Sequence, residues 1–323
     1  MFYKILELFH RLYVRKYRSE SKSLSDRGIT DVDKASEAII NLLLANEPCM
    51  IARFGSNEID AVVNYIGVNL LPKSKRSILG YIKSKCPEWW WSLRTMSNMK
   101  NQAGFFPSNA DSLSKFAKLM LEDSRQLDML GSWRTKEDYL NNIFSPNLIM
   151  CDREKLNPFF AKRPWTQALK GKKVLIVHPF VKSIYQQYSI KDKLFPTPIL
   201  PDFELKVMPA VQSIGGNPNF DSWFEALDFM KSEMDRIDYD IVLLGCGAYG
   251  FPLAAHAKRM GKKAIHIGGS LQLFFGIKGK RWESSGYKGG PNDYSIFFND
   301  FWVRPSDDET PKSAKGVEGG CYW

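Results

Sequence analysis

Tyr239–Trp282 reads YDIVLLGCGAYGFPLAAHAKRMGKKAIHIGGSLQLFFGIKGKRW and contains, in order, an apolar run, a glycine turn, a helical segment and a second apolar run. Ile241–Leu244 is apolar without alternation, which is typical of a strand covered on both faces. Pro252 suits the first turn of a helix, and Gly261 ends that helix before the second run, 263–267. The pattern predicts a βαβ unit in a Rossmann-like, mainly parallel α/β sheet with helices on both faces.

The turn of this unit has three glycines at the spacing G-x-G-x-x-G. The carboxyl edge of a parallel sheet presents free backbone N–H groups and positive helix ends, which bind phosphates. We therefore expect a phosphate-bearing ligand at this turn and at the turn after the second strand. The residues concerned are Gly245, Gly247, Ala248, Tyr249, Gly250, Gly268, Gly269 and Ser270. The alternative is a tight turn that needs glycine for its backbone alone.

A dinucleotide site would place an acidic residue at the end of the second strand, and His266 stands there instead. The lack of an acidic residue at the end of the second strand also argues against S-adenosylmethionine as the ligand of this turn.

The composition limits the class of protein. The chain has 323 residues, of which 44% are hydrophobic, and this is enough for a large core. The formal charge of +10 favours anionic partners, but the basic residues are spread out and no nucleic-acid-binding motif is visible. Five scattered cysteines without zinc spacing suit a reducing cytoplasm. With no signal peptide and no spanning apolar run, we expect a cytoplasmic protein.

The first twenty residues place apolar side chains at helical spacing among basic ones. The apolar residues are Phe2, Ile5, Leu6, Phe9, Leu12 and Tyr13. Such a helix can lie on an anionic membrane surface, here the inner face of the cytoplasmic membrane. The alternative is that it packs on its own domain or on a partner chain, and the sequence does not indicate an oligomeric state.

The order of elements suggests four parts: an N-terminal helix and linker (1–30), a first α/β part (31–164), a nucleotide-binding Rossmann-like part (165–304) and a tail (305–323). We expect helices at 31–45, 58–66, 74–100, 109–126, 182–188 and 221–237, the last capped by Asp221. Further strands are expected at 49–53, near 126–130 and 147–150, and at 173–177 and 205–211. The tail ends with Tyr322 and Trp323, and two terminal aromatics suggest that it docks on the ligand groove.

Residues 50–60, MIARFGSNEID, repeat the strand, glycine and helix pattern. Arg53 would project from the carboxyl end of the strand, and Glu58 would lie in the first turn of the helix. An arginine and a carboxylate at this place could hold an anionic donor and activate an acceptor hydroxyl. Alternatively, Glu58 only stabilises the helix N-terminus and Arg53 pairs with it.

Two patches together resemble bacterial glycosyltransferases of the GT-D class. Arg53-Phe54-Gly55 followed by Glu58 is similar to the Arg-Phe/Tyr-Gly-Asp-Gly-Glu signature of that class. Gly245–Gly268 is similar to its later glycine turn, helix with Leu-Ala, and K-x-A-I-x-I-G strand. The resemblance covers residues 50–60 and 240–269. It implies transfer of a sugar from a nucleotide-sugar donor to a saccharide or lipid-linked acceptor in surface polysaccharide biosynthesis.

The resemblance also implies roles for particular residues. Glu58 would be the base or would orient the acceptor, and Arg53 would bind phosphate or acceptor. His178 ends a strand and would face the same edge. The donor-binding set is then Gly55, Ser56, Asn57, His178, Gly245, Gly247, Ala248, Tyr249, Gly250, Gly268, Gly269, Ser270, Gln272, Lys280 and Arg281.

The chain departs from the class at its acidic positions. Ser56-Asn57-Glu58 replaces Asp-Gly-Glu, and Ser270-Leu271-Gln272 stands where the class carries a second Asp-x-Glu. A divalent metal needs oxygen ligands, usually carboxylates, so we assign no metal ligand. Lys278, Lys280 and Arg281 would neutralise a leaving diphosphate instead. The alternatives are a transferase that uses S-adenosylmethionine or another nucleotide cofactor, and a non-catalytic sugar-nucleotide binding or assembly protein.

Overall fold

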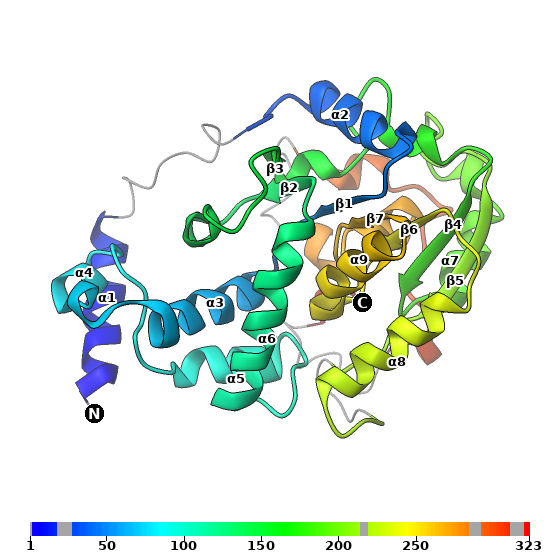
Figure 1. The fold of residues 1–323 in the computed structure, drawn as a ribbon. Helices are drawn as coiled ribbons and strands as arrows, with labels where there is room; N and C mark the ends of the chain where they lie inside the picture. Colours follow the sequence, from blue (N-terminus) through cyan, green and yellow to red (C-terminus); the bar gives the residue numbers. More distant parts are fainter. Residues whose placement is uncertain (1, 18–27, 214–218, 284–291, 311–319) are drawn as a thin grey trace.

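The computed structural model describes residues 2–17, 28–213, 219–283, 292–310 and 320–323. Its centre is a seven-stranded sheet with the order β3-β2-β1-β7-β6-β4-β5, in which every pair of neighbours is parallel (Figure 1). The strands are β1 (Cys49–Ala52), β2 (Met129–Ser132), β3 (Ile149–Asp152), β4 (Lys173–His178), β5 (Glu204–Pro209), β6 (Ile241–Leu244) and β7 (Lys263–His266). The prediction of a Rossmann-like α/β fold is confirmed.

The βαβ unit has the predicted order. Strand β6 leads through a 3₁₀ turn into helix α9 (Gly250–Arg259), and β7 returns parallel to β6, with Leu243 opposite Ile265. Gly261 has φ +76°, the left-handed conformation that ends the helix. On its other side β7 pairs with β1, with Ile51 opposite Ile265. The two central parts expected from the sequence therefore contribute to one continuous sheet.

The sheet separates two apolar cores, because successive side chains of a strand point to opposite faces. Met50 and Ala52 of β1 face one core, whereas Cys49 and Ile51 face the other. The first core is covered by α3 (Ser56–Tyr65), α6 (Ala110–Asp123), α8 (Trp223–Asp235) and α9. The second is covered by α2 (Val32–Leu44), α7 (Val181–Tyr188), α10 (Leu271–Phe274) and the segments around Trp165 and Trp302. Helices thus cover both faces, as predicted.

Several element boundaries differ from those predicted. Residues 74–100 are not one helix but two, α4 (Ile78–Ile82) and α5 (Leu93–Asn101), because Pro87 cannot continue a helix. The side chain of Asn64 holds the intervening segment by donating to Trp90 O (2.8 Å) and accepting from Ser92 N (3.1 Å).

Ser222, not Asp221, caps α8, since its hydroxyl accepts from Glu225 N at 3.2 Å. Strands β2 and β3 end two residues later than the sequence predicted. The α-helical part of α3 ends at Tyr65, and the chain continues directly as one π-helical turn, Ile66–Leu70.

The N-terminal helix α1 (Phe2–Tyr17) packs beside α4, away from the sheet (Figure 1). His10 Nδ1 lies 2.9 Å from Tyr81 O, and the rings of Tyr3 and Trp90 stack at 4.4 Å. Leu6 is buried, as expected for packing on the chain's own domain, but Phe2, Ile5, Phe9 and Leu12 are exposed. None of the helices in the described ranges is long and apolar enough to cross a bilayer.

Candidate functional site

Two adjoining cavities open along the carboxyl edge of the sheet. For each of the seven strands, the first residue after the strand lines one of these two cavities. In strand order along the chain these residues are Arg53, Trp133, Arg153, Pro179, Ala210, Gly245 and Ile267. All seven strands end at this edge because the sheet is entirely parallel, and this is where open α/β sheets bind ligands.

The larger cavity has a volume of about 370 Å³ and a polar lining. Three arginines line it, Arg53 after β1, Arg153 after β3 and Arg281 in the C-terminal segment, and two carboxylates, Glu58 and Glu154, line it as well. Positive charges from segments far apart in the chain therefore meet in one place. Such a group favours an anionic ligand.

Arg53 is fixed by close packing against Gly268. A Cβ atom at Gly268 would lie 1.7 Å from Arg53 Nη2, and Gly268 has φ +77°, so only glycine fits. Arg53 Nε donates to Ile267 O (3.2 Å) and Nη1 donates to Phe54 O (3.4 Å). Burial is the largest influence on the pKa of Arg53 and lowers it. The nearby groups of Glu58 and Tyr322 raise the pKa of Arg53, whereas the charges of Arg153 and Arg281 lower it. Glu58, Arg153 and Arg281 therefore lie close enough to Arg53 for their charges to interact with it.

The two carboxylates are held differently. Glu58 in the first turn of α3 folds back over Gly55, where a Cβ atom would lie 2.0 Å from Glu58 Oε2. Glu154 pairs with Arg153 and accepts from Tyr294 Oη at 2.9 Å and from Asn157 Nδ2 at 3.4 Å. Glu154 is thus built into a hydrogen-bonded network, and Glu58 lies close enough to Arg53 to raise the pKa of that guanidinium.

The glycine turn after β6 lines both cavities through Gly247 and Ala248. Gly247 has φ +59° and begins the 3₁₀ turn Gly247–Tyr249 that runs into α9. The first N–H groups of such a turn have no partners within it and carry the positive end of the helix. Gly250 has a packing role, because a Cβ atom there would lie 2.1 Å from His266 Nδ1.

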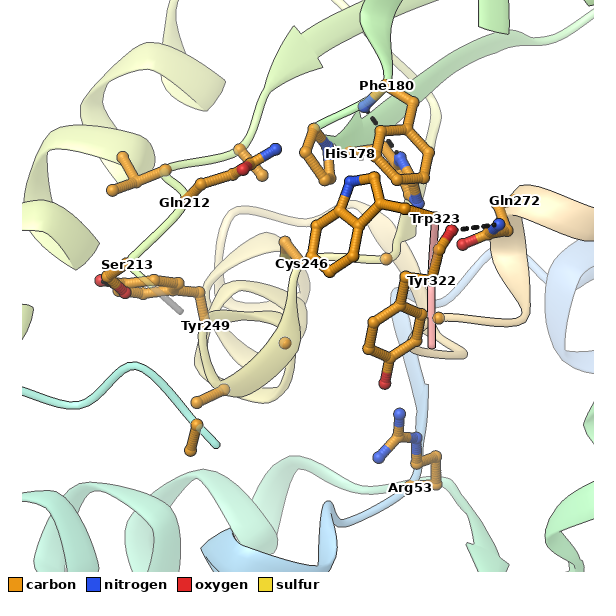
Figure 2. A pocket seen from close by; sticks show the side chains of 18 residues that line it. Arg53, His178, Phe180, Gln212, Ser213, Cys246, Tyr249, Gln272, Tyr322 and Trp323 are labelled. Carbon is orange, nitrogen blue, oxygen red and sulfur yellow. Dashed lines mark hydrogen bonds between the residues drawn. The ribbon is translucent and has the colours of Figure 1, made fainter. Parts of the chain in front are cut away.

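The smaller cavity, about 100 Å³, has a mainly apolar lining that includes Phe180, Tyr249 and Trp323 (Figure 2). Figure 2 shows the indole of Trp323 in the middle of the cavity and the ring of Tyr322 pointing toward Arg53. Tyr322 O accepts from Gln272 Nε2 (3.1 Å), and Tyr322 Oη accepts from Arg281 Nη1 (3.0 Å). Tyr322 and Trp323 therefore lie at the carboxyl edge of the sheet, as the two terminal aromatics suggested.

Two buried histidines lie beside the cavities. Burial lowers the pKa of His178 to about 3, and burial together with the nearby Arg53 lowers the pKa of His266 to about 3. His178 Nδ1 accepts from Phe180 N (3.1 Å), and His266 Nδ1 lies 3.3 Å from Leu244 O. Both imidazoles are therefore neutral near pH 7. They shape the turns and do not supply positive charge.

Most of the residues predicted to form the site lie together. Those that line one or both cavities are Arg53, Gly55, Ser56, Glu58, His178, Gly245, Gly247, Ala248, Tyr249, Gly269, Ser270, Gln272 and Arg281. Asn57, Gly250, Gly268 and Lys280 are absent from these two linings. Asn57 bonds to Gln102 Oε1 (3.2 Å), and Lys280 is exposed on the surface.

The sequence reasoning missed Trp133, Arg153, Glu154, Asn157 and Tyr294 in the polar lining. Trp133 and Arg153 form a cation–π pair at 4.2 Å. A signal was present, because Arg153 follows an apolar strand as Arg53 does. The strand was predicted to end at Met150 instead of Asp152, so Arg153 was not recognised as the residue that follows the strand.

Among the described residues, no group of three or more His, Cys, Asp or Glu side chains is placed to hold a metal ion. Comparison with protein-family models, with curated proteins and with solved structures gave no significant match.

Proposed function

We propose that this protein is a glycosyltransferase that moves a sugar from a nucleotide-sugar donor to a saccharide or lipid-linked acceptor, as in surface polysaccharide biosynthesis. One observation carries the proposal. Arg53, Arg153 and Arg281 line one cavity together with the turn at Gly247–Ala248. Three guanidinium groups and the backbone N–H groups of this turn match the oxygens and the charge of a diphosphate.

The neighbouring apolar cavity supports a nucleoside on the other side of the diphosphate. The two cavities share Arg53, Ala103, Gly247, Ala248, Gly269 and Tyr322, so one extended ligand could occupy both. Trp323 offers a ring face on which a base could stack. The donor would then have its diphosphate at the arginines and its sugar toward Glu58.

The chemistry follows from this placement. The acceptor oxygen forms a bond with the anomeric carbon while the bond from that carbon to the diphosphate oxygen breaks. Glu58 accepts the proton of the acceptor hydroxyl, and the arginines neutralise the charge of the departing nucleoside diphosphate. Glu58 is assigned this role because it lies in the first turn of α3 and lines the same cavity as Arg53.

The same charges bear on the alternative of an S-adenosylmethionine-dependent transferase. The sulfonium of that cofactor is a cation, and a cavity lined by Arg53, Arg153 and Arg281 would repel it. Binding of S-adenosylmethionine without binding of any nucleoside diphosphate would favour this alternative.

A binding experiment tests the donor site. Nucleoside diphosphates and their sugar derivatives are titrated against the wild-type protein, Arg153→Met and the control Arg163→Met, with the shift in melting temperature as readout. Arg163 lies outside both cavities, and its exposed side chain pairs with Glu37 at 3.6 Å. We expect Arg153→Met to weaken binding about 10- to 150-fold, the effect of losing a charge-assisted hydrogen bond of about 1.5–3 kcal/mol. Equal affinities of the two variants would remove the main support for the proposal.

A kinetic experiment separates an enzyme from a binding protein. Glu58→Gln keeps the shape of the side chain but removes the base, so turnover should fall about 10²–10⁴-fold while donor affinity changes little. A wild-type protein that binds nucleotide sugars tightly, yet transfers no sugar to water or to any acceptor, would be a sugar-nucleotide binding protein.

A further inference from the structure

We propose that helix α1 and the segment packed beside it form a docking surface for an anionic lipid bilayer. The surface comprises residues 2–17 and 70–94 and is called the N-terminal lobe below. Tyr81 of α4 stacks on His10 at 4.8 Å, and Trp90 stacks on Tyr3 at 4.4 Å, so the two stretches form one unit. Figure 1 shows α1 and α4 together at one end of the molecule, away from the sheet.

The first observation is the exposed apolar surface of the lobe. Within the described part of the chain, 18 large apolar side chains are exposed, and 11 of them belong to the lobe. Phe2, Ile5, Phe9 and Leu12 are each 45–55% exposed and recur at three- and four-residue spacing, so they form one face of α1. Leu6, which is buried, and His10, whose Nδ1 lies 2.9 Å from Tyr81 O of α4, lie on another face of the helix. An apolar helix face left open in this way indicates an interaction site.

The second observation is charge, and it identifies the partner. The lobe contains ten Lys and Arg but only Glu7 and Glu88, a formal charge of +8 out of +10 for the whole chain. The remaining residues are nearly neutral. Arg11 and Arg15 are exposed on another face of the same helix, where they line a hollow with Glu7 and Glu88. A basic helix with large apolar side chains on another face is the pattern of helices that lie in the interface of anionic membranes.

Charge also argues against a second copy of the chain as the occupant. Two identical lobes placed face to face would bring two groups of charge +8 together, which costs free energy unless anions intervene. A lipid surface offers negative headgroups for the basic residues and an apolar interior for Phe9 and Leu12. This inference does not depend on the proposed function.

Co-sedimentation with lipid vesicles tests the proposal. The probes are vesicles of phosphatidylcholine alone and vesicles that also contain phosphatidylglycerol. We expect wild-type protein to bind the anionic vesicles at low salt and to be released as salt is added, because salt screens the attraction. Arg11→Gln with Arg15→Gln should weaken binding about 25-fold, since each basic side chain near the surface contributes about fivefold.

The apolar face is tested by Phe9→Glu with Leu12→Glu, which should reduce binding at least about tenfold. Its control is Phe229→Glu, an equally exposed aromatic on α8 outside the lobe, which should bind as wild type does. Circular dichroism and melting temperature confirm that each variant is folded.

The proposal is overturned if the wild type does not bind anionic vesicles, or if the α1 variants and the control bind equally. It is also overturned if light scattering shows a dimer that only Phe9→Glu with Leu12→Glu dissociates. That result would assign the face to a second copy of the chain.

Discussion

Replacing Gly268 by alanine tests the placement of Arg53 most directly. The added Cβ atom would lie 1.7 Å from Arg53 Nη2, whereas real Cβ contacts essentially never fall below 3.0 Å. The guanidinium must therefore retreat by at least 1.3 Å, the difference between these distances. Its hydrogen bonds to Ile267 O and Phe54 O would then be lost or weakened. Hydrogen bonds of charged groups contribute about 1.5–3 kcal/mol.

Gly261 provides a matched control. It has φ +76°, close to the +77° of Gly268, but a Cβ atom there would meet nothing within 4 Å. Gly261→Ala should therefore cost only the left-handed backbone strain, about 1–2 kcal/mol. Gly268→Ala should cost this and the Arg53 contribution, about 2.5–5 kcal/mol in total.

Urea denaturation of the wild type and both variants measures the unfolding free energies. Titration with a nucleoside diphosphate measures ligand affinity, which should fall for Gly268→Ala but not for Gly261→Ala. If both variants unfold at the same urea concentration with the same slope, Arg53 does not rest against Gly268 and the described geometry of the site is wrong.

Two further predictions concern groups at the edge of the sheet. His178 and His266 have pKa values of about 3 in the folded protein and 6.5 as free groups, so the unfolded chain binds more protons between these values. The unfolding free energy should therefore be fully developed above pH 6.5 and fall as the pH is lowered, by up to about 1.4 kcal/mol per pH unit for each histidine. Denaturation across this range checks it, and an identical profile for His178→Asn and wild type would contradict the assignment for His178. Tyr322→Phe removes the hydroxyl that accepts from Arg281 but keeps the ring over Gly269, so it should cost about 1 kcal/mol in unfolding free energy. A melting curve identical to that of the wild type would show that this bond does not hold the tail.

The sequence predicted the features that depend on local patterns. The apolar runs, the turn glycines and Pro252 were sufficient for the βαβ unit, and the strand predicted at 49–53 was placed to within one residue. The length of the segment 74–100 was misjudged, although Pro87 is a local signal that interrupts a helix. The contact of Asn64 with Trp90 O, which holds the intervening backbone, is not visible to local propensity.

The roles of the glycines could be predicted only in part. Gly247 is needed for its positive φ, as a turn pattern suggests. Gly268 is needed because Arg53, 215 positions earlier, packs against it, and Gly250 because His266 does. Such requirements arise from tertiary contacts between distant residues, which a single sequence does not contain. Arg153 was missed for a simpler reason, since an error of two residues at the end of a strand moves a side chain away from the edge of the sheet.

The order of the strands has a consequence for how the chain can be made. Strands β3-β2-β1 and β6-β4-β5 form two groups of three, and only β7 lies between them. Because β7 comes last in the chain, a ribosome completes both groups before it supplies the strand that joins them. Until then the inner edges of β1 and β6 carry unpaired N–H and C=O groups on apolar strands, and such edges invite pairing with other chains. Synthesis that halts before residue 263 would therefore release two incomplete sheets, each with an open and aggregation-prone edge.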